Sequence, residues 1–259
     1  MKRSFLTAFA VLLATSSVLL SSGLARADAV SATYYAISAS DPSYNTLCCG
    51  TYNNEVLSGL GSDGLPILNP SYSGTMPNSA DLHTTGSGQE ITWWSPTLNP
   101  YVTQIGTGTA TLPINQTSNF FPCVVNASYP CNDASAGLAV HYYGTLTVPS
   151  TETVSFSIGA DDAAFAYLDG SNVCDLGGVH AYTLGTCATP FNIAAGTHTL
   201  DLFFVDMNQV QSGLYFSVAT EGVTVSPPTS VPEPGTLALL GFGLACVGLV
   251  RRRTCTDRR

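Results

Sequence analysis

The sequence has no lysine or arginine between Arg26 and Arg251, so its long central part carries no permanent positive charge. All eight basic residues lie near the two chain ends, whereas most of the seventeen Asp and Glu residues lie between Asp28 and Glu221. A domain without basic side chains cannot neutralise phosphates, which excludes nucleic acid as a partner and disfavours anionic membrane surfaces. Its carboxylates must therefore lie in water, accept hydrogen bonds, or bind metal ions.

Catalytic and zinc-binding motifs are also missing from the sequence. There is no C-x-x-C and the histidines are scattered, so a zinc site is not expected. Neither a G-x-S-x-G elbow nor an H-E-x-x-H motif occurs. Asp161 and Asp162 are adjacent in sequence, which suits a metal ion better than acid and base partners on either side of a sugar. We interpret the protein as non-catalytic.

The N-terminus has the three parts of a secretory signal. Lys2 and Arg3 precede an apolar stretch over 5–20, and small residues flank Arg26 at the expected cleavage site. We expect a signal peptide over 1–27 and a mature chain that begins at Asp28.

The C-terminus combines three ordered features. A Pro-Glu-Pro element precedes a short uncharged apolar segment over 236–250, and an arginine triplet follows it. A full membrane span needs about 20 apolar residues, so we expect a short, transient membrane helix with its arginines on the cytoplasmic side. The key residues are Val231, Pro232, Glu233, Pro234, Arg251, Arg252 and Arg253.

This arrangement over 231–259 resembles the PEP-CTERM sorting signal of Gram-negative bacteria that make exopolysaccharide. The resemblance implies recognition by an exosortase-type membrane enzyme, removal of the tail, and release to, or attachment at, the cell exterior.

Six cysteines lie in the mature region, and an even number in an exported chain indicates disulfides. The local pairs Cys123–Cys131 and Cys174–Cys187 would each close a loop. Cys48 and Cys49 are adjacent, and their pairing stays open between a vicinal bridge and partners elsewhere.

Between its two ends the chain shows short β-rich runs and no long helical period. Residues 154–158 alternate as a half-buried strand does, and 165–168 run into Asp169-Gly170, a dipeptide suited to a tight hairpin turn. The returning strand is expected over 173–176. Two further runs are expected at 197–205, which is nearly continuously apolar toward its end, and at 214–219.

These runs predict a single all-β domain, a β-sandwich, over 28–223. The first half of that domain, from Ser31 to about Tyr129, is interpreted as irregular with long loops. A Pro/Ser-rich stalk is expected over 224–230.

Three motifs follow one another over about 32–223: L-G-x-D-G-x-P from Leu60, the acidic pair Asp161-Asp162, and D-L-G-G-V-H from Asp175. In type and order they resemble the motifs of the fibro-slime domain, which is similar to the protective-antigen-type β-sandwich of yeast flocculins. The family's usual Glu-Arg after Phe203-Phe204 is replaced by Asp206-Met207-Asn208. This departure weakens any transfer of ligand specificity.

In the flocculin-like relatives, the matching Asp-Asp pair is joined by an unusual peptide bond and holds a Ca²⁺ ion that contacts sugar hydroxyls. The resemblance therefore implies a Ca²⁺ site at Asp161 and Asp162. Because Ca²⁺ takes six to eight oxygens, Asp206 and Asn208 are expected to contribute ligands. The alternative is that the pair only begins a strand and caps a turn.

Trp93 and Trp94 are candidate sugar-stacking residues, although adjacent side chains in a strand face opposite sides and one of them would then be in the core. Asp175, Gly177, Gly178 and His180 are interpreted as structural residues that shape a tight bend.

Three hypotheses about function follow. The first is an extracellular surface or matrix protein that binds polysaccharide with the help of Ca²⁺ in a biofilm or exopolysaccharide matrix. The second is a purely structural matrix protein in which any Ca²⁺ only stiffens the fold. Ice-binding or hydrolytic activity is a distant alternative, because no regular Thr-x-Thr array and no catalytic motif is visible.

Overall fold

The computed structural model describes residues 28–47, 53–186 and 191–228. The signal peptide, Cys48, Cys49, Cys187 and the sorting signal therefore lie outside the described residues. Within the described part the protein is all-β, as predicted, with two short 3-10 helices, η1 (Ser79–Asp81) and η2 (Pro122–Val124). No helix among these residues is long and apolar enough to cross a membrane.

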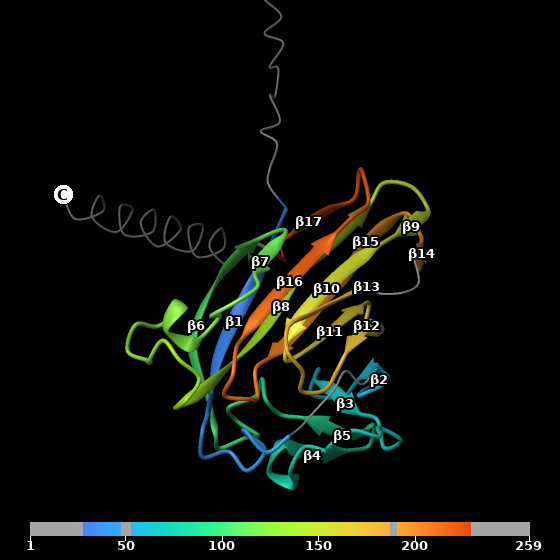
Figure 1. The fold of residues 1–259 in the computed structure, drawn as a ribbon. Coiled ribbons are helices and arrows are strands. Elements are labelled where there is room, and N and C mark those ends of the chain that lie inside the picture. The colour runs from blue at the N-terminus through green and yellow to red at the C-terminus, as the bar shows by residue number, and fades with distance from the viewer. Residues whose placement is uncertain (1–27, 48–52, 187–190, 229–259) are drawn as a thin grey trace, which may run out of the picture.

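The strands form two main sheets and a small two-stranded one (Figure 1). They are β1 (Ala29–Ser38), β2 (Val56–Leu60), β3 (Pro66–Leu68), β4 (Leu82–Thr85), β5 (Gly88–Ile91), β6 (Val102–Thr111), β7 (Ile114–Gln116), β8 (Ala136–Val148), β9 (Glu152–Val154), β10 (Phe156–Asp161), β11 (Ala163–Leu168), β12 (Ser171–Leu176), β13 (Thr183–Thr186), β14 (Phe191–Ile193), β15 (Gly196–Val205), β16 (Gly213–Val218) and β17 (Thr224–Ser226).

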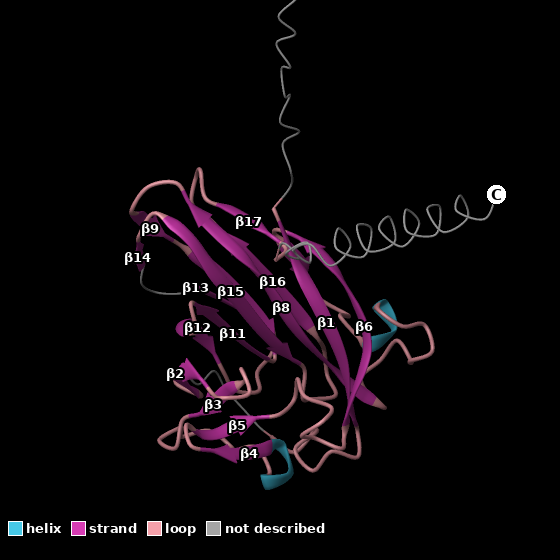
Figure 2. Cartoon of the chain, turned by 180° about the vertical axis from the view of Figure 1, so that it is seen from behind, coloured by secondary structure: helices cyan, strands magenta, loops and turns pink. Residues whose placement is uncertain are grey.

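The large sheet has the order β4-β5-β3-β2-β12-β11-β15-β8-β1-β6, with β17 paired to β8. The second sheet has the order β13-β10-β16-β7, and β14 pairs with β9. Figures 1 and 2 show β2–β5 at one end of the molecule, below the long strands β1, β8 and β15. All the pairings between these strands are antiparallel.

The central strands of the large sheet are buried on both faces. In β15, Leu202 and Phe204 pack into the core that faces the second sheet, whereas Phe203 and Val205 pack into a separate core on the opposite face. The segment 39–101, which contains β2–β5, supplies much of that second core. Burial on both faces explains why β15 is continuously apolar over its last four residues, 202–205, rather than alternating there.

The predicted hairpin is confirmed. β11 and β12 pair antiparallel, and Asp169 and Gly170 between them have φ values of +49° and +72°. Positive φ at both central residues is what a tight two-residue hairpin turn requires, and Gly reaches it without steric cost.

The interpretation of the first half as irregular is wrong for its long strands. β1 and β6 each contain ten residues and pair along nearly their whole length. Their Ala and Gly residues obscured the strand signal, because both residue types are depleted in strands. β17 occupies the start of the predicted stalk, where Val225 is buried opposite Leu146 of β8.

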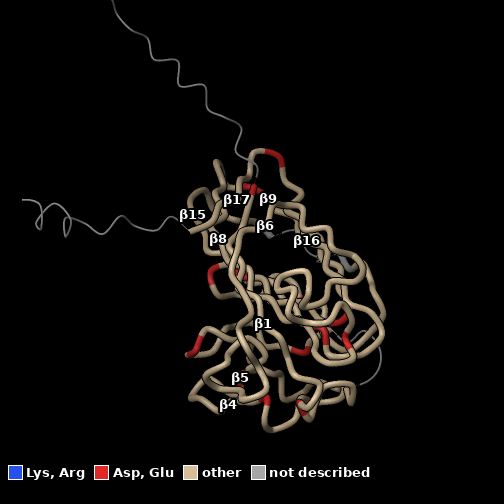
Figure 3. The backbone as a smooth tube through the Cα atoms, turned by 90° about the vertical axis from the view of Figure 1, so that its left-hand side faces the viewer, with Lys and Arg blue, Asp and Glu red and all other residues tan. Residues whose placement is uncertain are grey.

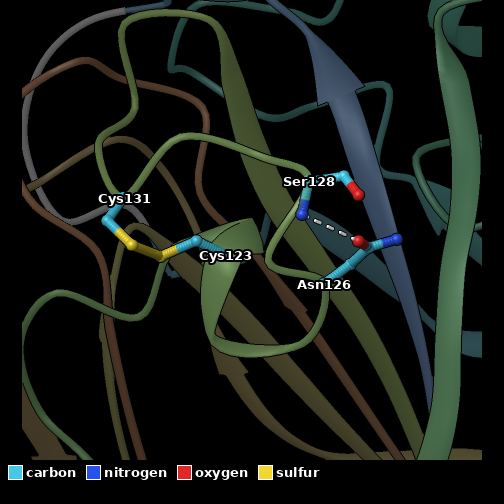
Figure 4. The surroundings of a disulfide bond; sticks show 4 residues. All are labelled: Cys123, Asn126, Ser128 and Cys131. Atoms are coloured by element: carbon cyan, nitrogen blue, oxygen red, sulfur yellow. Dashed lines mark hydrogen bonds between the residues drawn. A yellow bond between two sulfur atoms is a disulfide. The ribbon is translucent and has the colours of Figure 1, made fainter.

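A disulfide joins Cys123 to Cys131, with their Cα atoms 5.1 Å apart (Figure 4). Inside this loop the Ser128 N–H donates to Asn126 Oδ1 at 3.0 Å, which shapes the turn. Cys174, at the other predicted pair, is also disulfide-bonded. Its predicted partner Cys187 lies beyond the described residues.

Candidate functional site

The Asp161–Asp162 pair lies where the chain passes from one sheet to the other. Asp161 ends β10 in the second sheet, and Ala163 begins β11 in the large sheet. The peptide bond between the two aspartates is cis. Asp206 follows Val205, which pairs with Ala163 across the β11–β15 ladder. Sheet topology thus places Asp206 beside the pair.

Backbone N–H groups from two loops hold both carboxylates of the pair. Asp162 Oδ2 accepts a hydrogen bond from the Met207 N–H at 2.7 Å, and its Oδ1 accepts one from the His180 N–H at 3.2 Å. Asp161 Oδ2 accepts one from the Tyr182 N–H at 3.1 Å. His180 therefore contributes through its backbone, in agreement with its interpretation as a structural residue.

Asp133, which sequence reasoning did not single out, adds a further carboxylate to this region. Its charge raises the pKa of Asp161 and of Asp206, and its backbone carbonyl accepts a hydrogen bond from the Tyr44 hydroxyl at 2.6 Å. Its position two residues after Cys131 and shortly before the apolar run of β8 was the available signal. The pairing of β8 with β15, which brings it near Asp206, was not visible in the sequence.

Two oxygens of this cluster have no hydrogen-bond partner among the described residues. They are Asp206 Oδ2 and Asp133 Oδ2, and both are buried. Asp206 is fully buried, and its Oδ1 accepts only a long 3.4 Å hydrogen bond from the Asn208 N–H. A buried carboxylate oxygen without a donor is costly unless it is protonated or faces a cation.

Burial is the main electrostatic cause at this site. It raises the pKa of Asp162 to about 8, with a further contribution from the charge of Asp161. Burial and then the charge of Asp133 raise the pKa of Asp161 to about 6. Burial and the charge of Asp162 raise the pKa of Asp206 well above its usual value. The described residues contain no Lys or Arg to relieve this repulsion (Figure 3).

The pair opens into a surface pocket of about 340 Å³. Asp161, Asp162 and Asn208 lie in its wall, whereas Asp206 does not and lies deeper. The whole lining consists of Asp161, Asp162, Val179, His180, Ala181, Asn208, Val210 and Gln211. The structure therefore brings three of the four predicted metal ligands to one solvent-accessible hollow.

The donor set fits a hard divalent cation. Ca²⁺ accepts carboxylate, amide and water oxygens at 2.3–2.6 Å, and such oxygens surround the pocket. Across the described chain, this cluster does not bring three carboxylate oxygens within 4.8 Å of one another. A cation in the pocket would thus take Asp161 and Asp162 as charged ligands, with the Asn208 side chain and water completing its shell. The buried oxygens of Asp206 and Asp133 would add negative potential behind them.

Trp93 and Trp94 do not lie at this pocket's surface, and their prediction as stacking residues is corrected. Their exposed fractions are 1% and 3%, and both belong to the second core. Trp94 packs edge-on against Phe203 and Phe165, with ring centroids 5.0 and 6.3 Å away. Neither indole presents a face to solvent, so neither ring is available to stack on an external sugar.

Comparison with known proteins identifies the C-terminal motif. A family model described as the PEP-CTERM protein-sorting motif matches residues 230–253. This match confirms the predicted sorting signal, which indicates export to the cell surface or exterior and processing by an exosortase-type enzyme. No curated protein matches the chain.

Solved structures similar to this chain include three sandwich domains. The PA14 domain of the MpAFP antifreeze protein is 12% identical, with a TM-score of 0.38, covering 76% of this chain and 90% of that one. The PA14 sugar-binding domain from an RTX adhesin is 12% identical, with a TM-score of 0.33, covering 74% and 89%.

The third is the epithelial adhesin 6 A domain from Candida glabrata in complex with Galβ1-3GlcNAc. It is 13% identical, with a TM-score of 0.35, covering 77% of this chain and 83% of that one. At these identities and TM-scores the likeness carries no argument about ligand or activity.

Proposed function

We propose that this protein is an exported, non-catalytic binding protein of the cell surface or extracellular matrix, which engages polysaccharide through a Ca²⁺ ion held at Asp161 and Asp162. The observation that carries the proposal is the 340 Å³ pocket in which these two carboxylates meet without any basic partner. The sorting motif supports the location, because it directs the chain out of the cell.

Each residue of the pocket would have a distinct role in binding. Asp161 and Asp162 bind the cation, since backbone N–H groups already hold both side chains at the pocket. Asn208 lies in the same wall and offers an amide oxygen. When bound, Ca²⁺ supplies open coordination positions that hydroxyl oxygens of a sugar can fill. Ala181 and Val210 give the pocket an apolar border against which a sugar ring can pack.

Retention on polysaccharide tests this proposal directly. We expect the purified protein to bind the immobilised exopolysaccharide of the producing cell in Ca²⁺ and to elute on addition of EDTA. Asp161→Asn, which can keep the Tyr182 hydrogen bond through its amide oxygen, should reduce retention at least tenfold. The matched control is Glu221→Gln, which removes one exposed carboxylate from a distant turn and should bind as the wild type does. No retention with or without chelator would favour the purely structural hypothesis instead.

Thermal stability tests the Ca²⁺ site separately from the sugar. A ligand that binds only the folded state stabilises it by about 2.7 kcal/mol at a hundredfold excess over its dissociation constant. We expect melting curves of the wild type and Glu221→Gln to rise by several degrees in excess Ca²⁺ over EDTA. The curve of Asp161→Asn should not move. A Ca²⁺ shift of wild-type size in Asp161→Asn would place the ion elsewhere.

A further inference from the structure

A second set of metal-ligating side chains lies in the β2–β5 region, away from the acidic pair. Asp63 is in the loop between β2 and β3, His83 is in β4, and Glu90 is in β5. His83 and Glu90 are direct cross-strand partners in the β4–β5 hairpin, so their side chains share one face. The Asp63 N–H donates to Glu90 Oε1 at 3.1 Å, which fixes the loop over that face.

The ligand atoms of these three residues converge. His83 Nδ1 is 2.8 Å from Asp63 Oδ2 and 4.0 Å from Glu90 Oε2, and each of the three residues offers one ligand atom within 4.8 Å of the other two. Ligands at the usual 2.0–2.2 Å from a tetrahedral Zn²⁺ ion lie about 3.4 Å apart. The observed separations bracket that value, so small side-chain rotations would bring all three atoms into one coordination shell.

Glu90 points to a ligand independently of this convergence. Its side chain has no exposed surface, and its Oε2 has no hydrogen-bond partner among the described residues. The loop is shaped around this carboxylate, because a Cβ atom on Gly61 would overlap Glu90. His83 Nδ1 faces Asp63 at hydrogen-bonding distance and lies 4.0 Å from Glu90 Oε2, so its single N–H cannot also donate a hydrogen bond to this oxygen. A cation placed among the three groups would satisfy this oxygen.

We propose that Asp63, His83 and Glu90 form a binding site for a divalent transition-metal ion, with Zn²⁺ as the ion that fits best. One imidazole nitrogen and two carboxylate oxygens suit Zn²⁺, whereas Ca²⁺ prefers oxygen ligands alone. The Asp63 and His83 side chains are 40% and 43% exposed, which gives an ion an entry path and leaves room for a water ligand. The bound ion would tie the β2–β3 loop to the β4–β5 hairpin.

This site differs from the Ca²⁺ site in its residues, its position in the fold and its ligand chemistry. A zinc site was not expected from the sequence, because the histidines are scattered and these three residues are spread over positions 63–90 without a recognised ligand spacing. Their convergence depends on the β3–β5 and β4–β5 pairings, which only the fold provides.

Zn²⁺ titration of the full chain, stripped with EDTA and returned to excess Ca²⁺, tests the proposal. Calorimetry should show one equivalent of Zn²⁺ bound to the wild type. His83→Gln and Glu90→Gln should each weaken that binding by at least about a hundredfold. Loss of a residue that only supports a metal ligand weakens binding by about a hundredfold at most, so a larger effect indicates a direct ligand. Circular dichroism checks that each variant is folded, and the exposed position of His83 makes His83→Gln the safer of the two.

The matched control is His198→Gln. His198 Nδ1 faces Asp169 Oδ2 at 2.7 Å, much as His83 faces Asp63. This pair has no third ligand, because the only three-ligand group in the described ranges is the one proposed here. This variant should keep the wild-type Zn²⁺ affinity. The proposal is overturned if the wild type binds no Zn²⁺, if His83→Gln binds it as the wild type does, or if Glu90→Gln alone retains full affinity.

Discussion

Replacing Trp94 by alanine is expected to cost about 3–5 kcal/mol of unfolding free energy, the usual range for emptying a large aromatic site in a core. Trp94 is 3% exposed and packs on Phe203 and Phe165, two members of the second core, to which the segment 39–101 contributes many residues. Its Nε1–H also donates to the Phe204 carbonyl oxygen at 2.9 Å. Because small domains are stable by only about 5–15 kcal/mol, this loss removes a large share of the total.

Urea unfolding of Trp94→Ala and Trp94→Phe measures this effect and separates its two parts. The phenylalanine variant keeps most of the ring packing and loses the indole hydrogen bond, so we expect a cost of about 1–2 kcal/mol. Because the indole is buried, Trp94→Phe should still be retained on polysaccharide at low temperature. A folded Trp94→Phe protein that loses this retention would return Trp94 to the ligand surface and contradict its core assignment.

The second half of the domain was readable from sequence because its signals are local. Asp169-Gly170 predicts its hairpin through a property of two residues, positive φ, and the structure has that turn. The continuous apolar run of β15 indicates a strand buried on both faces. Gly177 and Gly178 were rightly interpreted as structural: Gly178 has a φ of +88°, and a Cβ on Gly177 would overlap Glu55.

The first half was not readable in this way because its structure depends on distant partners. β1 is held between β6 and β8, strands that follow it by many residues, and its own side chains are mostly small. The burial of Trp93 and Trp94 likewise depends on the large sheet, which contributes Phe165 and Phe203 from far along the chain. Local patterns do not specify which face of which sheet will cover an aromatic pair.

The residues of the candidate site also differ in whether a local pattern or a distant strand pairing places them there. Asp161 and Asp162 were found from a motif, and Asn208 from its place after an apolar strand; all three line one pocket. Asp133 was missed, because only the β8–β15 pairing brings its loop to the end of β15. The absence of Lys and Arg has a more general consequence. It predicts that carboxylates lack Lys and Arg partners, and the structure buries several of them.

Three further acidic groups set how stability depends on pH without any metal. Glu55 is 3% exposed, and its Oε2 accepts a hydrogen bond from the Gly178 N–H at 2.6 Å. Burial, with the charge of Asp175 adding to it, raises the pKa of Glu55 to about 7. Burial raises the pKa of Asp175 to about 6. Elsewhere, burial and a hydrogen bond with Asp81 raise the pKa of Asp41 to about 7.

The sign of the effect follows from proton binding. A carboxyl group whose pKa is higher in the folded state holds its proton there at pH values where the unfolded chain has released it. Its contribution to stability is complete below the unfolded pKa, near 4.5 for Glu55, and is lost as the pH rises through about 7. For Glu55 alone the loss amounts to about 3 kcal/mol, at 1.36 kcal/mol for each unit of pKa. Asp175 and Asp41 act in the same direction.

In EDTA, we therefore expect the protein to be most stable near pH 4–5 and to lose stability steadily toward pH 8, the reverse of the usual acid sensitivity of paired carboxylates. Urea unfolding at several pH values measures this slope. The side chain introduced by Glu55→Gln stays neutral at every pH. The unfolding free energy of this variant should therefore fall by about 3 kcal/mol less than that of the wild type over the same pH range. Asp169 is largely exposed, and its hydrogen bond to His198 lowers its pKa. Its carboxylate therefore gains its stabilising charge at pH values below this range. Stability that rises from pH 4 to pH 8 would contradict this prediction, and an unchanged slope in Glu55→Gln would show that Glu55 is already ionised in the folded protein across this range.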